Sequence, residues 1–290
     1  MSFFCSLFGY TKQAYYKIHT SRSVQSVKEQ QVKAAVLAIR RQMPRIGTRK
    51  LYYMLQETFT QQQIKMGREK LFTVLRREGL LVARRRKPTI TTNSKHWMHK
   101  YPNLIKDISV ERPEQVWAAD ITYLDTHDGN AYLHLVTDVY SKQIMGYELC
   151  NNMEAASTLK ALVMALKNRK YPDKPLIHHS DRGLQYCSRL YTNTLLRNNI
   201  AISMTENGDP YENAVAERIN GILKTEFELG ITMNDLMEAT DITRQSISIY
   251  NTLRPHLSCA MLTPLQMHQQ QSITLKTWKR KTSPAVASEV

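Results

Sequence analysis

The stretch from residue 178 to residue 224 constrains the fold most strongly, because it joins a strand pattern to an amphipathic helix pattern. An apolar run at 175–177 comes just before Asp181 and a turn-forming Arg-Gly pair, which predicts a strand that ends in a turn. From about Tyr211, apolar residues recur at helical spacing and leave Glu217 on another face of the predicted helix. Open α/β sheets bind ligands at the carboxyl ends of their strands, so the sequence predicts an α/β fold with a site near Asp181.

A third acid, Asp120, lies inside a predicted strand over 116–124. A carboxylate in such a strand costs free energy unless it is paired or ligates a metal ion. If Asp120, Asp181 and Glu217 meet, each pair at 4 Å repels by about 4 kcal/mol at an effective dielectric near 20, and a cation would offset this repulsion. An all-oxygen site suits Mg²⁺. We therefore expect the three acids to bind Mg²⁺, with Mn²⁺ as a substitute, and two such ions would suit an in-line phosphodiester displacement.

Each acid also has an ordinary structural interpretation. An Asp at the end of a strand is often a turn residue, and an exposed Glu on a helix is often only solvated. The combination of three acids in these settings favours catalysis, helped by Lys224, which lies roughly 10 Å along the helix from Glu217 at about 1.5 Å per residue. Asn213 falls on the same face of the helix. The rival acids Asp125 and Asp128 are expected in a hairpin, and Asp138 is a less favoured metal neighbour.

The motifs around these acids resemble those of a known family. Asp120, Asp181 and Glu217, with 35 residues between the last two, are similar to the DDE motif of transposases and retroviral integrases. The stretches at 117–123, 179–186, 213–218, 250–251 and 254–256 resemble the downstream-frame (OrfB-type) transposases of the insertion sequence three family. The resemblance implies an RNase H-like core with a mixed five-stranded sheet, in which the strand of Asp120 pairs beside the strand of Asp181.

The same resemblance implies an activity and a set of partners. It implies metal-dependent cleavage and strand transfer of double-stranded DNA at the ends of an insertion sequence, with two metal ions when DNA is bound. It implies that Lys224 matches a basic position that contacts the DNA end, and Asn213 and Arg218 are further candidate DNA contacts. It also implies a homo-oligomer working on paired ends, and a shorter upstream-frame (OrfA-type) partner or fusion.

The charge of the chain is distributed unevenly. The whole chain has 40 Lys and Arg against 25 Asp and Glu, and residues 1–100 hold 21 and 4 of them, a balance of +17. The remaining residues hold 40 − 21 = 19 and 25 − 4 = 21, a balance of −2. A polycationic first third joined to a nearly neutral body indicates a polyanionic partner, most often nucleic acid.

Helical patterns in this basic third predict a small DNA-binding region over 1–83. We expect a short helix at 11–18, a helix near 26–42 that ends before Pro44, a helix capped by Thr48, and a helix from about Gly67 to Glu78. Short helices with a basic outer face suggest a helix-turn-helix-like module, although a small bundle with solvated charges is the open alternative. The candidate DNA contacts are Arg68, Lys70, Arg76 and Arg77.

The rest of the chain divides into three predicted parts. Residues 84–108 read as a basic linker, in which Arg84, Arg85, Arg86 and Lys87 suit phosphate contact without sequence reading. Residues 109–270 form the predicted RNase H-like domain, with strands at 116–124, 131–138, 143–149, 175–180 and 201–204, helices near 154–169 and 187–198, and a helix capped by Thr232 that runs to about Tyr250. Residues 271–290 read as a disordered basic tail.

Cysteines and apolar runs limit the cellular setting. The four cysteines are scattered without zinc-ligand or disulfide spacing, and no apolar run approaches the roughly 20 residues of a membrane span. We therefore expect a cytoplasmic, nucleoid-associated bacterial protein without a membrane partner. Two other functions remain as alternatives: an RNase H-type nuclease, and a catalytically inactive DNA-binding regulator.

Overall fold

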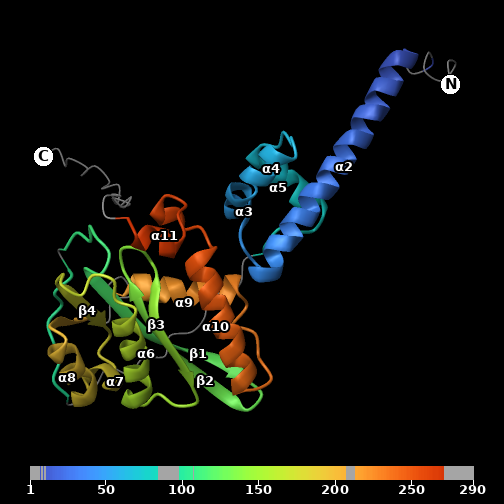
Figure 1. The fold of residues 1–290 in the computed structure, drawn as a ribbon. Helices are drawn as coiled ribbons and strands as arrows, with labels where there is room; N and C mark the ends of the chain where they lie inside the picture. The colour runs from blue at the N-terminus through green and yellow to red at the C-terminus, as the bar shows by residue number, and fades with distance from the viewer. Residues whose placement is uncertain are drawn as a thin grey trace, which may run out of the picture.

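The computed structural model describes Leu7, Gly9 and residues 11–83, 98–106, 108–206 and 213–270. It shows a long helix with three short helices beside it, and a sheet covered by helices (Figure 1). The predicted linker contacts Arg84 to Lys87 and the predicted tail at 271–290 lie outside the described residues.

The sheet has five strands in the order β3-β2-β1-β4-β5. The strands are β1 (Val116–Thr126), β2 (Gly129–Asp138), β3 (Ile144–Cys150), β4 (Leu176–Ser180) and β5 (Ile200–Met204). The first three pair antiparallel, whereas β4 and β5 are parallel to β1, which is the predicted mixed sheet. The hairpin between β1 and β2 turns at residues 127–128, so Asp128 lies in the turn and Asp125 lies on β1 within the expected hairpin.

Helices cover both faces of the sheet. Helices α6 (Ala155–Lys167), α7 (Leu184–Cys187) and α8 (Arg189–Arg197) pack with Trp117 and Ala119 of β1 in one hydrophobic cluster. Helices α9 (Ala214–Glu226) and α10 (Leu236–Thr252) contribute to a second cluster that contains Leu124 of the same strand. This division follows from the alternation of side chains along a strand.

One glycine sets how closely α6 approaches the sheet. A Cβ atom added to Gly146 on β3 would lie 2.1 Å from the Ala161 carbonyl oxygen and 2.6 Å from the Ala165 nitrogen. No side chain fits at these distances, so the helix backbone rests directly on the strand at this point.

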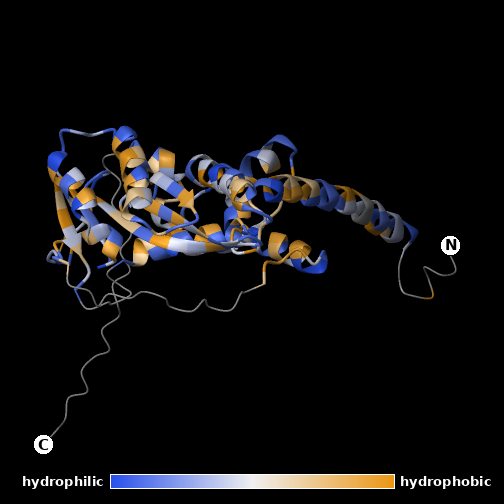
Figure 2. Cartoon of the chain, turned by 90° about the horizontal axis from the view of Figure 1, so that it is seen from below, coloured by the Kyte–Doolittle hydropathy of each residue, from blue (hydrophilic) through white to orange (hydrophobic). Residues whose placement is uncertain are grey.

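The N-terminal region differs from the prediction. Helix α2 (Lys12–Gln42) is continuous, so the predicted separate helices at 11–18 and 26–42 were wrong. Residues 19–25 include no Gly or Pro to end a helix, and the helix capped by Thr11 runs through them. It projects away from the rest of the molecule, and hydrophobic and hydrophilic residues alternate along it (Figures 1 and 2).

Three short helices pack near the inner end of α2. They are α3 (Thr48–Met54), α4 (Gln56–Gln61) and α5 (Arg68–Arg77). Gly47 occupies the position before α3 and Thr48 is its first residue, so Thr48 is not the predicted cap. Gly79 follows α5 with φ +67°, in agreement with the predicted glycine stop.

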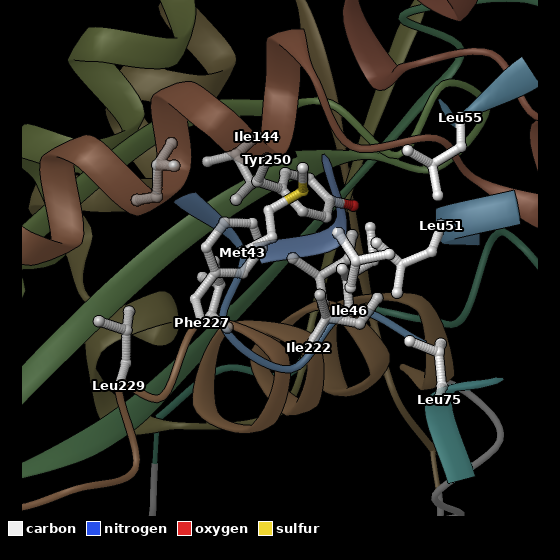
Figure 3. Close-up of a cluster of buried hydrophobic side chains, with 14 of the residues drawn as sticks. Met43, Ile46, Leu51, Leu55, Leu75, Ile144, Ile222, Phe227, Leu229 and Tyr250 are labelled. Atoms are coloured by element: carbon white, nitrogen blue, oxygen red, sulfur yellow. The ribbon is translucent and has the colours of Figure 1, made fainter. Parts of the chain in front are cut away.

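The short helices and the sheet domain share one hydrophobic cluster. Met43, Ile46 and Leu51 from the N-terminal region pack with Phe227 and Tyr250 (Figure 3). The predicted linker packs on the other hydrophobic cluster through Met98 and Tyr101, and the Met204 amide of β5 donates a hydrogen bond of 3.2 Å to the Pro102 carbonyl. The predicted boundary near residue 109 therefore falls inside a packed structure.

The C-terminal segment is fastened by polar contacts. Asp235, rather than the predicted Thr232, caps α10. The Asn251 side chain pairs with both backbone groups of Ile144 at 3.0 and 2.9 Å. A 3-10 turn (Leu257–Cys259) leads to α11 (Pro264–His268), which Thr263 caps. In the described part of the chain, no helix has the length and apolarity to span a membrane.

Candidate active site

The pairing of β1 with β4 brings Asp120 and Asp181 together. Val116 is opposite Ile177 and Ala118 is opposite His179, an offset of 61 residues. The same offset relates Asp120 to Asp181, since 181 − 120 = 61. Adjacent strands lie about 4.8 Å apart, so this register sets the two acids side by side at the carboxyl end of β4.

Local hydrogen bonds orient both carboxylates. Asp120 Oδ1 accepts a hydrogen bond from the Ile121 amide at 2.9 Å, and its Oδ2 accepts one from Asn220 Nδ2 at 2.8 Å. Asp181 Oδ1 accepts one from the Gly183 amide at 2.9 Å. A Cβ at Gly183 would lie 3.0 Å from that Oδ1, so the glycine leaves the space that the carboxylate uses.

Helix α9 runs along β1 and supplies the third acid. Asn220 reaches Asp120 as described, and Glu217, one turn earlier on the same face, is exposed. Asn213, which the sequence suggested as a DNA contact, is buried and donates a hydrogen bond of 3.0 Å to the Ala119 carbonyl. This hydrogen bond fastens the start of α9 to β1, and a DNA contact at Asn213 stays a prediction.

Electrostatics connect all three acids. The pKa of Asp120 is raised to about 7, first by burial and then by the nearby charges of Asp181 and Glu217, against the hydrogen bonds from Asn220 and the Ile121 amide that favour ionisation. Burial also raises the pKa of Glu217. Asp120 therefore lies within electrostatic range of both other acids, and its charge is costly in the metal-free protein.

The acids do not form a closed metal cage. Among the residues that the structure describes, no group of three or more His, Cys, Asp or Glu side chains is arranged to hold a metal ion. Both Asp120 oxygens and one Asp181 oxygen accept hydrogen bonds from the protein. The expectation that the three carboxylates cluster tightly enough to enclose magnesium is thus not met by the geometry of this state.

Lys224 lies two turns beyond Glu217, as its spacing predicted. Its ammonium group is 4.1 Å from the centroid of the Tyr123 ring. Burial lowers the pKa of Lys224, while Asp125 and Asp120 oppose that change. A cation therefore lies along β1 beside the acids, and Asp125 is a neighbour of this cation.

The other predicted DNA contacts occupy three different settings. Arg218 is exposed on α9. On α5, Lys70 and Arg76 are exposed, and the half-exposed Arg68 forms an ion pair of 2.8 Å with Glu69. Arg77 is held by Glu29 at 2.5 Å and by Glu78 at 3.3 Å, so its charge is already paired within the protein.

Two residues at the site were not predicted. Asn220 could have been predicted from the sequence, because it lies three residues after Glu217. Residues three apart on a helix share one face. Tyr186 is buried, its hydroxyl has no hydrogen-bond partner within the described residues, and burial with Asp181 and Asp120 raises its pKa well above the ordinary value. Nothing in the sequence pattern distinguishes Tyr186 from a core tyrosine.

The arrangement has a defined chemical capacity. The site places carboxylate oxygens at the end of the parallel pair β1 and β4, and the adjacent helix α9 carries the cation Lys224. No cysteine or serine is proposed as a nucleophile. Oxygen ligands of this kind suit hard divalent cations, and such ions promote the displacement at a phosphodiester.

Known proteins share this chain's sequence. Two family models described as integrase core domain match residues 110–210 and 198–264. An uncharacterized 31 kDa protein of insertion element IS600 from Shigella sonnei is 33% identical over 270 residues, covering 92% of this chain and 97% of the relative. Transposase InsF of IS3A from Escherichia coli K12 is 37% identical over 199 residues, or 68% of each chain. The HTLV-2 integrase catalytic core, solved with magnesium, aligns with a TM-score of 0.44 and 19% identity, covering 55% of this chain and 98% of that one.

Proposed function

This chain belongs to the IS3 family of insertion-sequence transposases, and we propose that it cuts and joins DNA strands through Asp120, Asp181 and Glu217. The observation that carries the assignment of these residues is the β1–β4 register, because it sets Asp181 beside Asp120. The raised pKa of Asp120, to which burial and then both other acids contribute, supports it. Perturbed acids in a site are frequent at catalytic positions.

The protein's own groups prepare the site. Asn220 and the Ile121 amide hold the Asp120 carboxylate in one orientation, and the Gly183 amide holds Asp181. Glu217, exposed with a raised pKa, would accept a proton from the attacking water or 3′ hydroxyl. Lys224 would contact the phosphate backbone next to the bond that is cut.

The donor chemistry fits a divalent metal ion. Three carboxylates supply only oxygen ligands, which Mg²⁺ prefers, and Mn²⁺ would substitute. Burial and then the charges of Asp181 and Glu217 make ionised Asp120 costly, and a cation would offset this cost. Asp120 and Asp181 would hold the ion with Glu217 as a further ligand, and two ions are proposed when DNA is present. The bound metal would activate the nucleophile and stabilise the leaving oxygen.

The basic first third would bring DNA to this site. The exposed side chains of α5 include Arg68, Lys70 and Arg76. We propose that the helical region around them is helix-turn-helix-like. The substrate would be the element's terminal repeats and a target duplex in the bacterial nucleoid. A homo-oligomer on paired ends and an upstream-frame partner complete the proposal.

A cleavage assay tests the assignment of the acids. A labelled DNA fragment carrying the end of the chain's own element is incubated with Mg²⁺ and the wild type, Asp120→Asn, Asp181→Asn or Glu217→Gln. Each variant should lose cleavage and strand joining while it still retards the DNA in a gel. Asp128→Asn, an exposed acid in the β1–β2 turn, is the matched control and should remain active. Strand joining by the Asp181→Asn variant would show that Asp181 does not belong to the catalytic site.

The same assay separates the alternatives. An RNase H-type nuclease would cut an RNA–DNA hybrid and would not join strands. A DNA-binding regulator would bind the element end without cutting it in any metal. Either result with the wild type would replace the proposed function.

A further inference from the structure

A second site lies between the N-terminal helices and the sheet domain. It is a cleft of about 960 Å³ with walls from α3, α5, α9 and the segment after α10. Figure 1 shows α9 between the sheet and helices α3–α5. Pockets of this size accommodate small organic ligands.

The lining of the cleft is strongly cationic. It includes Arg49, Lys50, Lys142, Arg218 and Arg254, and no Asp or Glu belongs to the described residues that line it. Glu226, just outside, pairs with Lys50 at 2.8 Å and with Arg254 twice at 2.9 Å. The Glu226 carboxylate thus pairs with two of the five cationic side chains. The cleft therefore keeps a positive electrostatic potential that attracts anions.

Two residues that line this cleft hold a buried nitrogen without a hydrogen-bond partner among the described residues. Arg254 is 1% exposed, and its Nη1 has no hydrogen-bond partner among the described residues, although its other two nitrogens bind Glu226. His256 is 9% exposed, and its Nε2 is likewise unpartnered. Buried polar atoms are rarely left unpaired in native proteins, so both atoms indicate a missing acceptor.

The protonation of His256 reflects the surrounding charge. Its pKa is lowered to about 3, first by burial and then by the charges of Arg254, Lys142 and Lys50, while Glu226 opposes them. The neutral ring can donate a hydrogen bond from Nε2, because Nδ1 lies 3.1 Å from the Ser258 hydroxyl and can accept from it. The wall of the cleft therefore holds one charged donor and one neutral donor whose hydrogen-bonding capacity is not used within the described residues.

Apolar side chains form the rest of the wall. Phe72 on α5, Val215 and Ile219 on α9, and Leu257 and Met261 beyond α10 line the cleft. Inorganic phosphate alone would leave these side chains against water and would fill little of the volume. A phosphate that carries a planar, weakly polar group satisfies both parts of the lining, since aromatic side chains such as Phe72 stack on nucleobases.

Helix α9 separates this cleft from the acids. Glu217, Asn220 and Lys224 repeat at one face of the helix, and the first two lie toward Asp120. Val215, Arg218 and Ile219 repeat at another face and line the cleft. A ligand in the cleft would touch the helix that carries Glu217 without occupying the acid site.

We propose that the cleft between α5, α9 and Arg254 binds one nucleotide, with its phosphate on Arg254, His256 and Arg218 and its base against Phe72. The nucleotide is either free or an unpaired unit of a DNA strand. Its role in strand transfer rests on the proposed function, whereas the binding itself does not.

Calorimetric titration of the full chain tests the proposal. The ligands are dAMP, deoxyadenosine, inorganic phosphate and a short single-stranded oligodeoxynucleotide. We expect dAMP to bind more tightly than deoxyadenosine or phosphate. Arg218→Gln and Arg254→Lys should each weaken dAMP about tenfold, as loss of a charge-assisted hydrogen bond does. Phe72→Ala should weaken the binding of dAMP and leave the binding of inorganic phosphate unchanged.

Controls distinguish the outcomes. Lys160→Gln removes one charge from exposed α6 and should bind dAMP like the wild type. Thermal melting followed by circular dichroism checks that each variant is folded. If Arg254→Lys is unfolded, the dAMP affinities of Arg218→Gln and Phe72→Ala decide the test. Binding of the oligonucleotide but not dAMP, with the same variant losses, assigns the strand as the source. Wild-type affinity in Arg218→Gln and Phe72→Ala overturns the proposal. Asp120→Asn should bind dAMP normally, which separates this result from failure of the cleavage assignment.

Discussion

Replacing Asp120 by asparagine should stabilise the metal-free protein at high pH while it abolishes cleavage. The folded-state pKa of Asp120 is about 7 against an ordinary 3.8. Because the folded state holds this proton more tightly, the wild type loses stability as pH rises from about 4 to 7 and stays low above it. At about 1.4 kcal/mol for each pH unit, the loss reaches about 4 kcal/mol.

Asparagine removes this charge and keeps most of the contacts. Its side-chain oxygen can accept from the Ile121 amide, and its amide can donate to Asn220 Oδ1, which has no partner among the described residues. Losing the charge-assisted character of two hydrogen bonds costs about 1–2 kcal/mol. The net gain at pH 8 is therefore about 2–3 kcal/mol, or about 3–5 °C in Tm for a chain of this size.

Thermal unfolding in a chelator measures this effect. Circular dichroism melts of the wild type, Asp120→Asn and Asp128→Asn are compared at pH 4 and pH 8. Asp120→Asn should melt above the wild type at pH 8 and close to it at pH 4, and Asp128→Asn should follow the wild type at both. An equal difference at both pH values, or none at pH 8, would refute the reasoning.

Three further changes have expected outcomes. Gly183→Ala should displace the Asp181 carboxylate and slow cleavage more than tenfold with little change in Tm, measured by the DNA cleavage assay and melting. Glu226→Gln should destabilise the fold by about 3–5 kcal/mol in urea unfolding, because it leaves buried Arg254 unpaired. The pKa of His268 is lowered by burial but raised to about 9 overall by its carboxylate neighbours, so its stabilisation of up to about 3 kcal/mol should be lost between pH 6.5 and 9, and His268→Gln should show no such loss in melts across that range.

The sequence contained most of the acid site. Alternation around Asp120 was sufficient to place it on a strand, the apolar run before Asp181 placed that acid at a strand end, and helical spacing placed Glu217 on α9. That the strands of Asp120 and Asp181 are neighbours came from the family resemblance, since strand order depends on contacts far apart along the chain. The structure then supplied the register that aligns the two aspartates.

Contacts between distant segments could not be predicted. Asn213 looked like a polar member of an exposed helix face, yet the Ala119 carbonyl offers it a buried partner 94 residues away. The apolar stripe around Met43 fits a separate helical bundle equally well, and only the structure shows it packed on Phe227 and Tyr250. Local patterns record which side of an element is apolar, not which surface covers it.

Some predictions failed at element ends for local reasons. Helix α2 continues through residues 19–25 because polar residues there do not end a helix. Asp235 caps α10 in place of Thr232, and both residue types are good caps, so sequence alone did not choose between them.

Titration of Mg²⁺ into the protein bound to its element end tests the central claim most directly. Calorimetry should detect Mg²⁺ binding to the wild type and to Asp128→Asn, and Asp120→Asn and Asp181→Asn should bind at least tenfold more weakly. Wild-type Mg²⁺ affinity in both of these variants would contradict the claim that the acids at the β1–β4 junction hold the metal for DNA cleavage.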